Sequence, residues 1–498
     1  MFRAYKRSDR TDMATTIYAD TTPLLEAIAA ADTGRSIQET LDLLRAQNVP
    51  PARIAGRVGL AALWGNADPH ALGVLATVGR VSMWMRTTPA GPEPGDDARR
   101  KLAPAYPLMQ AFSVVADAAR KGLADTHPSL PEPILPGELK NGQTVYDAVR
   151  DAFGRRDLNT LRALLMGYHA TGADYRSFQT AIYAALAHRY PEGGHPLIFA
   201  LTGCHILDMA EWGDHEPEMI YWYPPLVLDS TPDASVALAA RDYASQPDHD
   251  LSWLRTRLSI PKEDAAGAAY QQALSAGDGA AACDATLAAL RNGATPRGLA
   301  SAMALVVAAH INAVPQGDIS QLVRLGHVLQ YVHSVQLAMR HTQEQHVFPL
   351  LYTAACVVNG LGAVGAPVIQ SGSASVSLMT GGLIPSIMLR GVEQMSSAAD
   401  VGGALATARR YIQMGHPPTG LTGILATVAA QRDVAGDAET PHTLPTVTAA
   451  CEAYLMLPGA LAEKGQNALL TAAIRLASEL RGSSALAERV RAAIDEAV

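Results

Sequence analysis

Four histidines stand at comparable places in four apolar segments of this chain, and their type and spacing suggest metal binding. These histidines are His70, His195, His346 and His442. A small residue follows each histidine after seven positions. These residues are Thr77, Thr202, Thr353 and Ala449. Because an α-helix turns by about 100° per residue, a spacing of seven returns to nearly the same face. We therefore expect each histidine to begin a buried helix, and the four helices to bring four imidazoles together.

Helix starts favour the form of histidine that binds metals. The positive end of the helix dipole disfavours the imidazolium ion, and neutral imidazole is the metal ligand. A set of four histidines without paired cysteines suits iron, copper, nickel or zinc rather than calcium or magnesium. In the third segment, His310 and His341 are alternatives to His346 as the ligand. The sequence thus predicts a transition-metal site.

A second group of side chains is expected one layer deeper, at the tenth residue after each histidine. These residues are Arg80, His205, Cys356 and Glu452. Among them, His205 and Glu452 are candidates to orient the metal ligands from behind. His188 and His310 end the preceding apolar helices of the second and third segments, and they are further candidates to line the same cavity.

The elements that must position these histidines recur in the same order. Upstream of each lie a short Leu-rich helix, a turn and a longer Ala-rich helix; the turns carry Pro50-Pro51, Gly172, Thr295-Pro296 and Pro417-Pro418. This pattern predicts an all-α fold of four degenerate helical repeats with internal pseudo-symmetry. The predicted organisation is an N-terminal segment (1–34) and one domain (35–498), with repeats at about 35–120, 155–245, 280–400 and 401–498. In the third repeat, 36 residues separate His310 from His346, and their periodicity predicts one inserted helix.

Composition narrows the class of protein. The chain has 498 residues, of which 48% are hydrophobic and 5% aromatic, and its net charge is −8. That charge argues against nucleic acid as a partner, because no basic field is available to hold phosphates. No uninterrupted apolar run reaches the ~18 residues of a membrane span, and the first residues lack the apolar core of a secretory leader. Four cysteines without a CxxC pair predict buried free thiols. We expect a cytoplasmic protein.

Three segments resemble questin oxidase-like proteins. They are HPLIFALTGCHILD (195–208), HVFPLLYTAACVV (346–358) and LMGYHATGADYRSFQTAIY (165–183). The resemblance implies an all-α fold, a histidine-bound non-haem iron, and oxidative opening of aromatic polyketide rings such as anthraquinones. Phe199 stands where that family carries a second histidine after HPLI.

The sequence leaves several functions open. The first hypothesis is a metal-dependent oxygenase or oxidase, with iron as the expected cofactor and a small organic, in the family's case aromatic, substrate. The second is a non-enzymatic helical repeat protein that binds a partner or a small hydrophobic ligand. The third is an accessory subunit of a redox system. A homo-oligomer is compatible with each of them.

Overall fold

The protein folds as an assembly of α-helices. The computed structural model describes residues 20–124, 129–140, 142–172, 174–231, 233–257, 261–368, 384–432, 443–480 and 484–498. Within these ranges there are 23 α-helices and no strand, which confirms the predicted all-α class. The division into four related repeats stays a prediction.

The helices follow one another with short connections. They are α1 (Thr22–Ala29), α2 (Thr33–Arg45), α3 (Pro51–Trp64), α4 (Pro69–Thr87), α5 (Asp96–Leu102), α6 (Ala105–Gly122), α7 (Val145–Arg155), α8 (Leu158–Ala170), α9 (Tyr175–Leu186), α10 (His195–Met209), α11 (Glu216–Leu228), α12 (Ser235–Ala244), α13 (Ala268–Leu274), α14 (Gly279–Arg291), α15 (Pro296–Ala313), α16 (Ile319–His341), α17 (Leu350–Asn359), α18 (Pro385–Ser397), α19 (Val401–Gln413), α20 (Pro418–Ala430), α21 (Thr443–Leu455), α22 (Gly459–Glu479) and α23 (Ala485–Ala497). Short 3-10 helices are η2 (Pro136–Glu138), η3 (Pro191–Gly194), η4 (Pro247–His249), η5 (Ser252–Thr256) and η6 (Glu263–Ala266).

The predicted turn residues begin and end helices as expected. Pro51, Pro296 and Pro418 are each the first residue of a helix, where the missing N–H costs nothing. Thr295 precedes α15 and accepts a hydrogen bond from the Gly298 amide at 2.9 Å. Gly172 follows α8 with a φ of +64°, in the left-handed region that glycine enters without strain.

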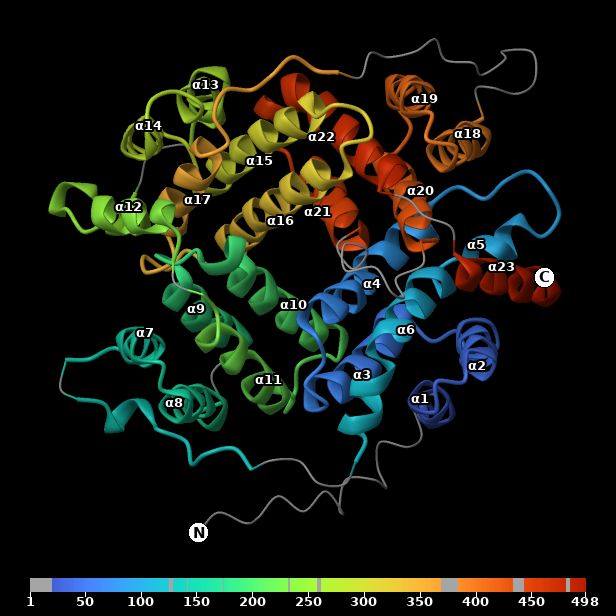
Figure 1. The fold of residues 1–498 in the computed structure, drawn as a ribbon, viewed down its shortest axis with the longest axis horizontal. Coiled ribbons are helices and arrows are strands. Elements are labelled where there is room, and N and C mark those ends of the chain that lie inside the picture. Colours follow the sequence, from blue (N-terminus) through green and yellow to red (C-terminus); the bar gives the residue numbers. More distant parts are fainter. Residues whose placement is uncertain are drawn as a thin grey trace.

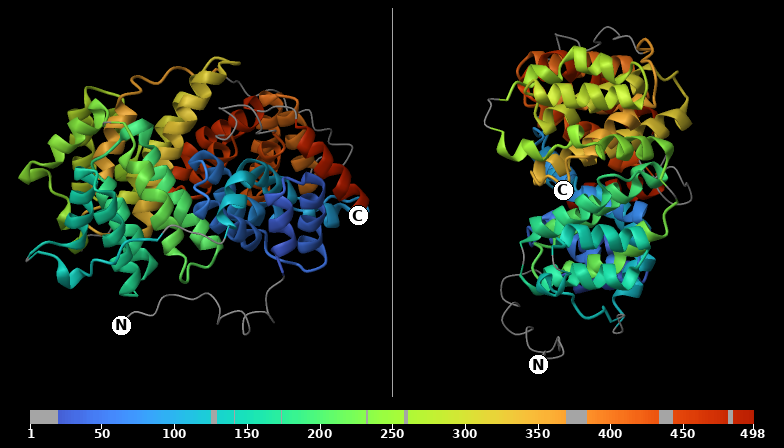
Figure 2. Two further views of the ribbon diagram at one scale, coloured as in Figure 1. Left: turned by 60° about the horizontal axis from the view of Figure 1, so that its bottom comes forward. Right: turned by 90° about the vertical axis from the view of Figure 1, so that its left-hand side faces the viewer.

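Four helices form a closed ring around the centre of the molecule (Figure 1). Helix α4 contacts α10, α10 contacts α16, α16 contacts α21, and α21 contacts α4. Two of these helices belong to the N-terminal half of the chain and two to the C-terminal half, and the halves occupy opposite sides of the molecule in the right-hand view of Figure 2. The ring therefore joins segments that lie far apart in the sequence.

A second set of helices packs behind the ring, and each member bridges two ring helices. Helix α3 contacts α4 and α10, α9 contacts α10 and α16, α15 contacts α16 and α21, and α20 contacts α21 and α4. Small residues allow these close approaches. At Gly56 of α3, a Cβ atom would lie 2.5 Å from the backbone of Met209 in α10, so only glycine fits there.

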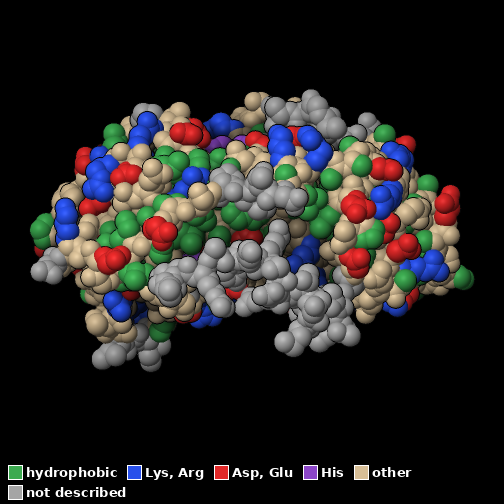
Figure 3. Space-filling view, turned by 90° about the horizontal axis from the view of Figure 1, so that it is seen from below, with side chains coloured by type: hydrophobic (Ala, Val, Ile, Leu, Met, Phe, Trp, Pro, Cys, Tyr) green, Lys and Arg blue, Asp and Glu red, His purple; other side chains and the backbone are tan. Residues whose placement is uncertain are grey.

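The N-terminal helix, the cysteines, the hydropathy of the helices and the surface charges complete the description of the fold. Helix α1 lies within the 1–34 segment and packs on α2 and α6. The four cysteines are buried and free, as predicted. Among the described helices, none combines the length and apolar character that a bilayer crossing demands. Acidic and basic side chains are interspersed over the face drawn in Figure 3.

Candidate metal centre and cavity

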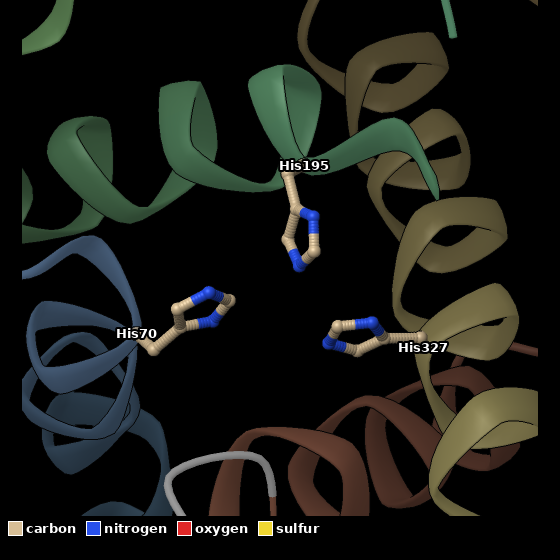
Figure 4. Close-up of side chains that lie close together, drawn as sticks. All are labelled: His70, His195 and His327. Carbon is tan, nitrogen blue, oxygen red and sulfur yellow. The ribbon is translucent and has the colours of Figure 1, made fainter. Parts of the chain in front are cut away.

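Three histidines converge at one end of the ring. They are His70 of α4, His195 of α10 and His327 of α16, and their side chains point toward one another (Figure 4). One ring nitrogen from each lies within 4.8 Å of the other two. All three side chains are partly buried. The structure thus brings together His70 and His195, which sequence analysis selected, with His327, which it did not.

Local structure fixes the first two histidines at the starts of their helices. His70 is the second residue of α4, after Pro69, and the Asp68 carboxylate accepts hydrogen bonds from the His70 and Ala71 amides at 3.0 and 3.1 Å. His195 is the first residue of α10 and follows Gly194, whose φ is +85°. A Cβ atom on Gly194 would lie 2.3 Å from the Tyr331 ring of α16. The glycine therefore lets the start of α10 approach α16 closely.

The third histidine is placed differently. His327 lies in the ninth position of α16, well inside the helix, so neither a cap nor a turn marks it. Helix α16 has eight residues before His327, whereas α4 has one before His70 and α10 has none before His195. His327 nevertheless lies at the level of His70 and His195.

The rings pack edge to face, and Phe199 covers one side of the group. The His195 ring is nearly perpendicular to those of His70 and His327, at centroid distances of 4.8 and 4.5 Å. Phe199, one turn after His195, lies 5.1 Å from the His195 ring and 5.2 Å from the His70 ring. Its apolar ring separates two imidazoles from water on that side.

The environment keeps two of these imidazoles neutral. Burial lowers the pKa of His70, against the opposing effect of the Asp68 and Glu192 carboxylates. Burial, and then the neighbouring His70, lowers the pKa of His195 to about 4. Both rings are therefore unprotonated at neutral pH, in the form that donates a lone pair to a metal.

The donor set fits a transition-metal ion. Tetrahedral coordination at about 2.0–2.1 Å places ligand nitrogens roughly 3.3 Å apart, so the rings would close by about 1.5 Å at most from the 4.8 Å limit. Three histidines leave further coordination positions for a water, oxygen or substrate atom, as in catalytic rather than structural sites. Imidazole nitrogen accepts iron, copper, nickel and zinc alike.

A narrow cavity runs along the inside of the ring from His70, which is the member of the three-histidine group that lines it. Its volume is about 70 Å³. The third, seventh and tenth residues after each of these histidines line it. They are Gly73, Thr77 and Arg80 from α4, Ile198, Thr202 and His205 from α10, and Gln330, Ser334 and Leu337 from α16. Pro445, Thr448 and Ala449 of α21 complete the wall. The three helices are thus in the same register with respect to the cavity.

The end of the cavity away from the histidines is strongly polar. The Arg80 guanidinium donates to Glu452 Oε2 at 2.6 Å and bonds His205 Nε2. Glu452 Oε2 also bonds His333 Nε2 at 3.0 Å. Burial alone raises the pKa of the Glu452 carboxyl, but Arg80 and His333 outweigh it and hold that pKa well below its ordinary value. Burial, and then Arg80, lower the pKa of His205 well below its ordinary value. We call Arg80, His205, His333 and Glu452 the inner cluster.

Other predicted ligands lie elsewhere or outside the described residues. His346 lies in the turn before α17, where its ring packs on Tyr146 of α7 at a centroid distance of 5.2 Å. His442 precedes α21 and is not among the described residues. His341, an alternative for the third repeat, ends α16, and its Nδ1 lies 3.4 Å from the Tyr183 hydroxyl.

The remaining predicted supporting residues divide into two groups. His205 and Glu452 belong to the inner cluster and are not members of the three-histidine group. His188 and His310 do not line the cavity. His188 follows α9, where burial lowers its pKa to about 4, and His310 bonds the backbone of Gly362. The free thiol of Cys356 forms a hydrogen bond with the Cys283 thiol, at 3.4 Å between the sulfur atoms.

A signal for His327 was present in the sequence. Ser334 follows it by seven residues, as a small residue follows the other histidines. The 36-residue stretch after His310 holds α16, which is the ring helix of this part of the chain and not an insertion before it. Comparison with known protein families, with curated proteins and with solved structures finds no match in any of the three.

Proposed function

We propose that this protein is a metal-dependent oxidoreductase in which His70, His195 and His327 hold a transition-metal ion. The observation that carries the proposal is the convergence of three imidazole nitrogens within 4.8 Å, one of them from His70, which also lines the cavity. A transition-metal ion would accept a lone pair from all three imidazoles at once.

The proposal that the reaction is an oxidation rests on the sequence resemblance and on the three nitrogen donors. Three neutral nitrogens with open positions suit iron or copper chemistry with oxygen, and iron is the metal that the resemblance implies. When bound, the metal would supply oxygen activation next to an organic substrate. A small organic molecule, aromatic in the resembling family, is the substrate class that we propose.

The protein's own groups would support that chemistry in three ways. Phe199 shields the His70 and His195 rings, which keeps water from one side of the centre. The Asp68 cap fixes the start of α4 and hence the direction of His70. Thr77 and Thr202 line the cavity two helical turns after His70 and His195. Each hydroxyl donates to a carbonyl of its own helix, that of Val74 or Ile198, so their methyl groups can present an apolar wall.

Oxygen consumption tests this proposal. The untagged chain would be loaded anaerobically with Fe(II), Cu(I) or Zn(II) and mixed with electron-rich hydroxyaromatic compounds under a defined oxygen concentration. We expect substrate-dependent oxygen uptake with a redox-active metal and none with zinc. His327→Ala should abolish the uptake and His346→Ala should retain it. Metal binding without oxygen uptake for any substrate would favour a ligand-binding protein or a redox accessory subunit instead.

A further inference from the structure

Two cysteine side chains lie against each other outside the ring of helices. Cys283 belongs to α14 and Cys356 to α17, and their Sγ atoms are 3.4 Å apart. The structure describes all four cysteines, each as a free thiol, and this is the pair whose sulfur atoms are in contact. Helices α14 and α17 pack directly on each other, so the contact is part of a helix interface. The fold therefore holds one thiol within reach of another.

Backbone carbonyls and a glycine help to fix the two sulfur atoms. Cys356 Sγ lies 3.5 Å from the Gly279 carbonyl oxygen, and Cys283 Sγ lies 3.8 Å from the Tyr352 carbonyl oxygen. The Tyr352 hydroxyl donates in turn to the His249 carbonyl at 2.9 Å. A Cβ atom at position 279 would lie 3.2 Å from Cys356 Sγ, so glycine at the first residue of α14 leaves room for that sulfur. The thiol pair thus has a defined place between packed helices.

The thiol pair is buried, but it lies close to the surface. The exposed fractions of Cys283 and Cys356 are 0% and 2%. Gly279, whose carbonyl contacts Cys356, is partly exposed, and its neighbours Asp278 and Ala280 are exposed. Cys356 therefore lies directly under a segment of backbone that contacts water, at the start of a helix. Because the fraying of helix ends costs little free energy, we expect a molecule as small as hydrogen peroxide to reach the pair.

The two sulfur atoms differ in their readiness to react. The hydrogen bond from Cys283 lowers the pKa of the Cys356 thiol, against the opposing effect of burial. Hydrogen bonding to Cys356, and then burial, raises the pKa of the Cys283 thiol. Because the thiolate is the nucleophilic form of cysteine, we expect Cys356 to react first and Cys283 second. Cys204 of α10 provides a contrast, since burial raises the pKa of its thiol.

We propose that Cys283 and Cys356 form a reversible oxidation site, at which hydrogen peroxide converts the two thiols to a disulfide. In the first step, Cys356 Sγ attacks one peroxide oxygen: an S–O bond forms, the O–O bond breaks, and the released hydroxide takes up the thiol proton as water. In the second step, Cys283 Sγ attacks Cys356 Sγ: the S–S bond forms, the S–O bond breaks, and the second hydroxide leaves with the Cys283 proton as water. The two sulfur atoms together lose two electrons, which reduce the peroxide to water.

The disulfide would close a covalent loop around part of the ring. Its formation requires the sulfur atoms to approach by about 1.4 Å, because a disulfide bond is about 2.05 Å long. The segment between Cys283 and Cys356 contains α15 and the ring helix α16, which carries His327. A cross-link across so long a segment restricts the unfolded chain, so oxidation should stabilise the folded protein. This effect does not depend on a metal at the three-histidine group.

Peptide mapping by mass spectrometry tests the oxidation site in the full chain. The natural chain, reduced and then treated with a chelator, would be exposed to hydrogen peroxide under native conditions, and the remaining thiols would be alkylated. We expect a peptide that joins Cys283 to Cys356, which dithiothreitol separates again, while Cys204 and Cys451 are alkylated. In Cys283→Ser, oxidation of Cys356 should stop at the sulfenic acid, which dimedone captures. In Cys356→Ser, Cys283 should remain a thiol.

Urea denaturation measures the effect of the cross-link on stability. The peroxide-treated natural chain should unfold at a higher urea concentration than the reduced chain. Cys204→Ser, the control at another buried thiol, should show the same shift, and Cys283→Ser should show none. Four alkylated cysteines after peroxide treatment, or a disulfide between any other pair, would overturn the oxidation site. A disulfide that leaves the urea midpoint unchanged would overturn its stabilising effect. The natural chain alone decides both points, so a variant that fails to fold does not leave the proposal undecided.

Discussion

The two ends of the cavity are built from the same ring helices but hold their polar groups in different ways. At the inner cluster, Arg80 and Glu452 carry opposite charges and bond each other, and His205 and His333 join the same network. At the other end, three side chains of one kind face one another, and two of them have lowered pKa values. The neutral His70 and His195 rings lack the opposite charges that join Arg80 to Glu452.

This difference separates two kinds of buried polar site. The inner cluster compensates its charges internally, so it contributes to the folded state without any added group, and breaking it should cost stability. The three histidines gain most from a cation that takes up their lone pairs, so their main contribution should depend on metal. Removing metal and removing single side chains should therefore affect the two ends differently.

The largest expected effect is the coupling of stability to metal at the three-histidine end. A metal that binds only the folded chain stabilises it by about 4 kcal/mol when its free concentration is 1,000 times the Kd. Denaturant titration with and without a chelator measures this difference. We expect it to vanish in His195→Ala and to persist in Arg80→Gln. If the chelator changed the free energy of unfolding equally in both variants, the three-histidine group and the inner cluster would not differ in their dependence on metal.

The second effect concerns the charge pair of the inner cluster. Glu452→Ala leaves Arg80 and His333 without their carboxylate, and we expect a loss of about 2–3 kcal/mol, below the value for fully buried pairs because both groups retain some exposure. Glu211→Ala is the matched control, because its pair with Arg53 also measures 2.6 Å but the Glu211 side chain is 59% exposed; we expect a loss of up to about 1 kcal/mol. Urea denaturation measures both variants. Equal losses in the two would show that the inner cluster behaves as a surface pair.

The third effect is the acid sensitivity that His205 gives to the inner cluster. Its pKa in the folded chain lies well below the ordinary value near 6.5, so below pH 6.5 the unfolded chain takes up a proton that the folded chain does not. Stability should therefore fall with decreasing pH from about 6.5, by up to about 1.4 kcal/mol per pH unit for this group. His205→Gln keeps an acceptor for Arg80 but cannot be protonated, so the slope between pH 6.5 and 5 should decrease. An unchanged slope would assign the acid sensitivity to other histidines, such as His188 and His341.

The smallest effect concerns the Phe199 ring, which covers one side of the three-histidine group. Phe199→Leu removes the aromatic contacts with His70 and His195, which are worth about 0.5–1.5 kcal/mol, so metal affinity should fall about 2- to 10-fold. Phe178→Leu removes a buried ring of α9 that does not line the cavity. It should reduce stability but leave metal affinity unchanged. Competition with a metal-sensitive dye gives both affinities, and a similar decrease in the two variants would contradict a specific role for Phe199.

Local sequence signals predicted much of the fold. Proline at helix starts, Thr295 as a cap and Gly172 after α8 act through a few neighbouring residues, so they can be read from the chain alone. Helical periodicity also identified the stretch that forms α16. The place of α16 in the ring could not be predicted from the sequence. Helical periodicity indicates which face of a helix is buried, but it does not indicate which other helix packs against that face.

In the candidate site too, local signals could be predicted from the sequence, whereas contacts between distant helices could not. His70 and His195 carry proline and glycine signals at the starts of their helices, and both were selected. His327 lies inside α16 without such a signal, and only the contacts of α16 with α10 and α21 bring it to the centre. The spacing of ten residues located Arg80, His205 and Glu452, but the charge pairing that joins them depends on tertiary packing.

Elemental analysis of the untagged full-length chain tests the central claim most directly, with His327→Ala and His346→Ala measured beside it. We predict about one transition-metal ion per chain in the natural protein and in His346→Ala, and at least ~100-fold weaker metal binding in His327→Ala, since even supporting residues around metal ligands cost 10- to 100-fold. A natural chain without metal after reconstitution, or a His327→Ala variant that retains the metal as well as the natural chain does, would contradict the three-histidine centre.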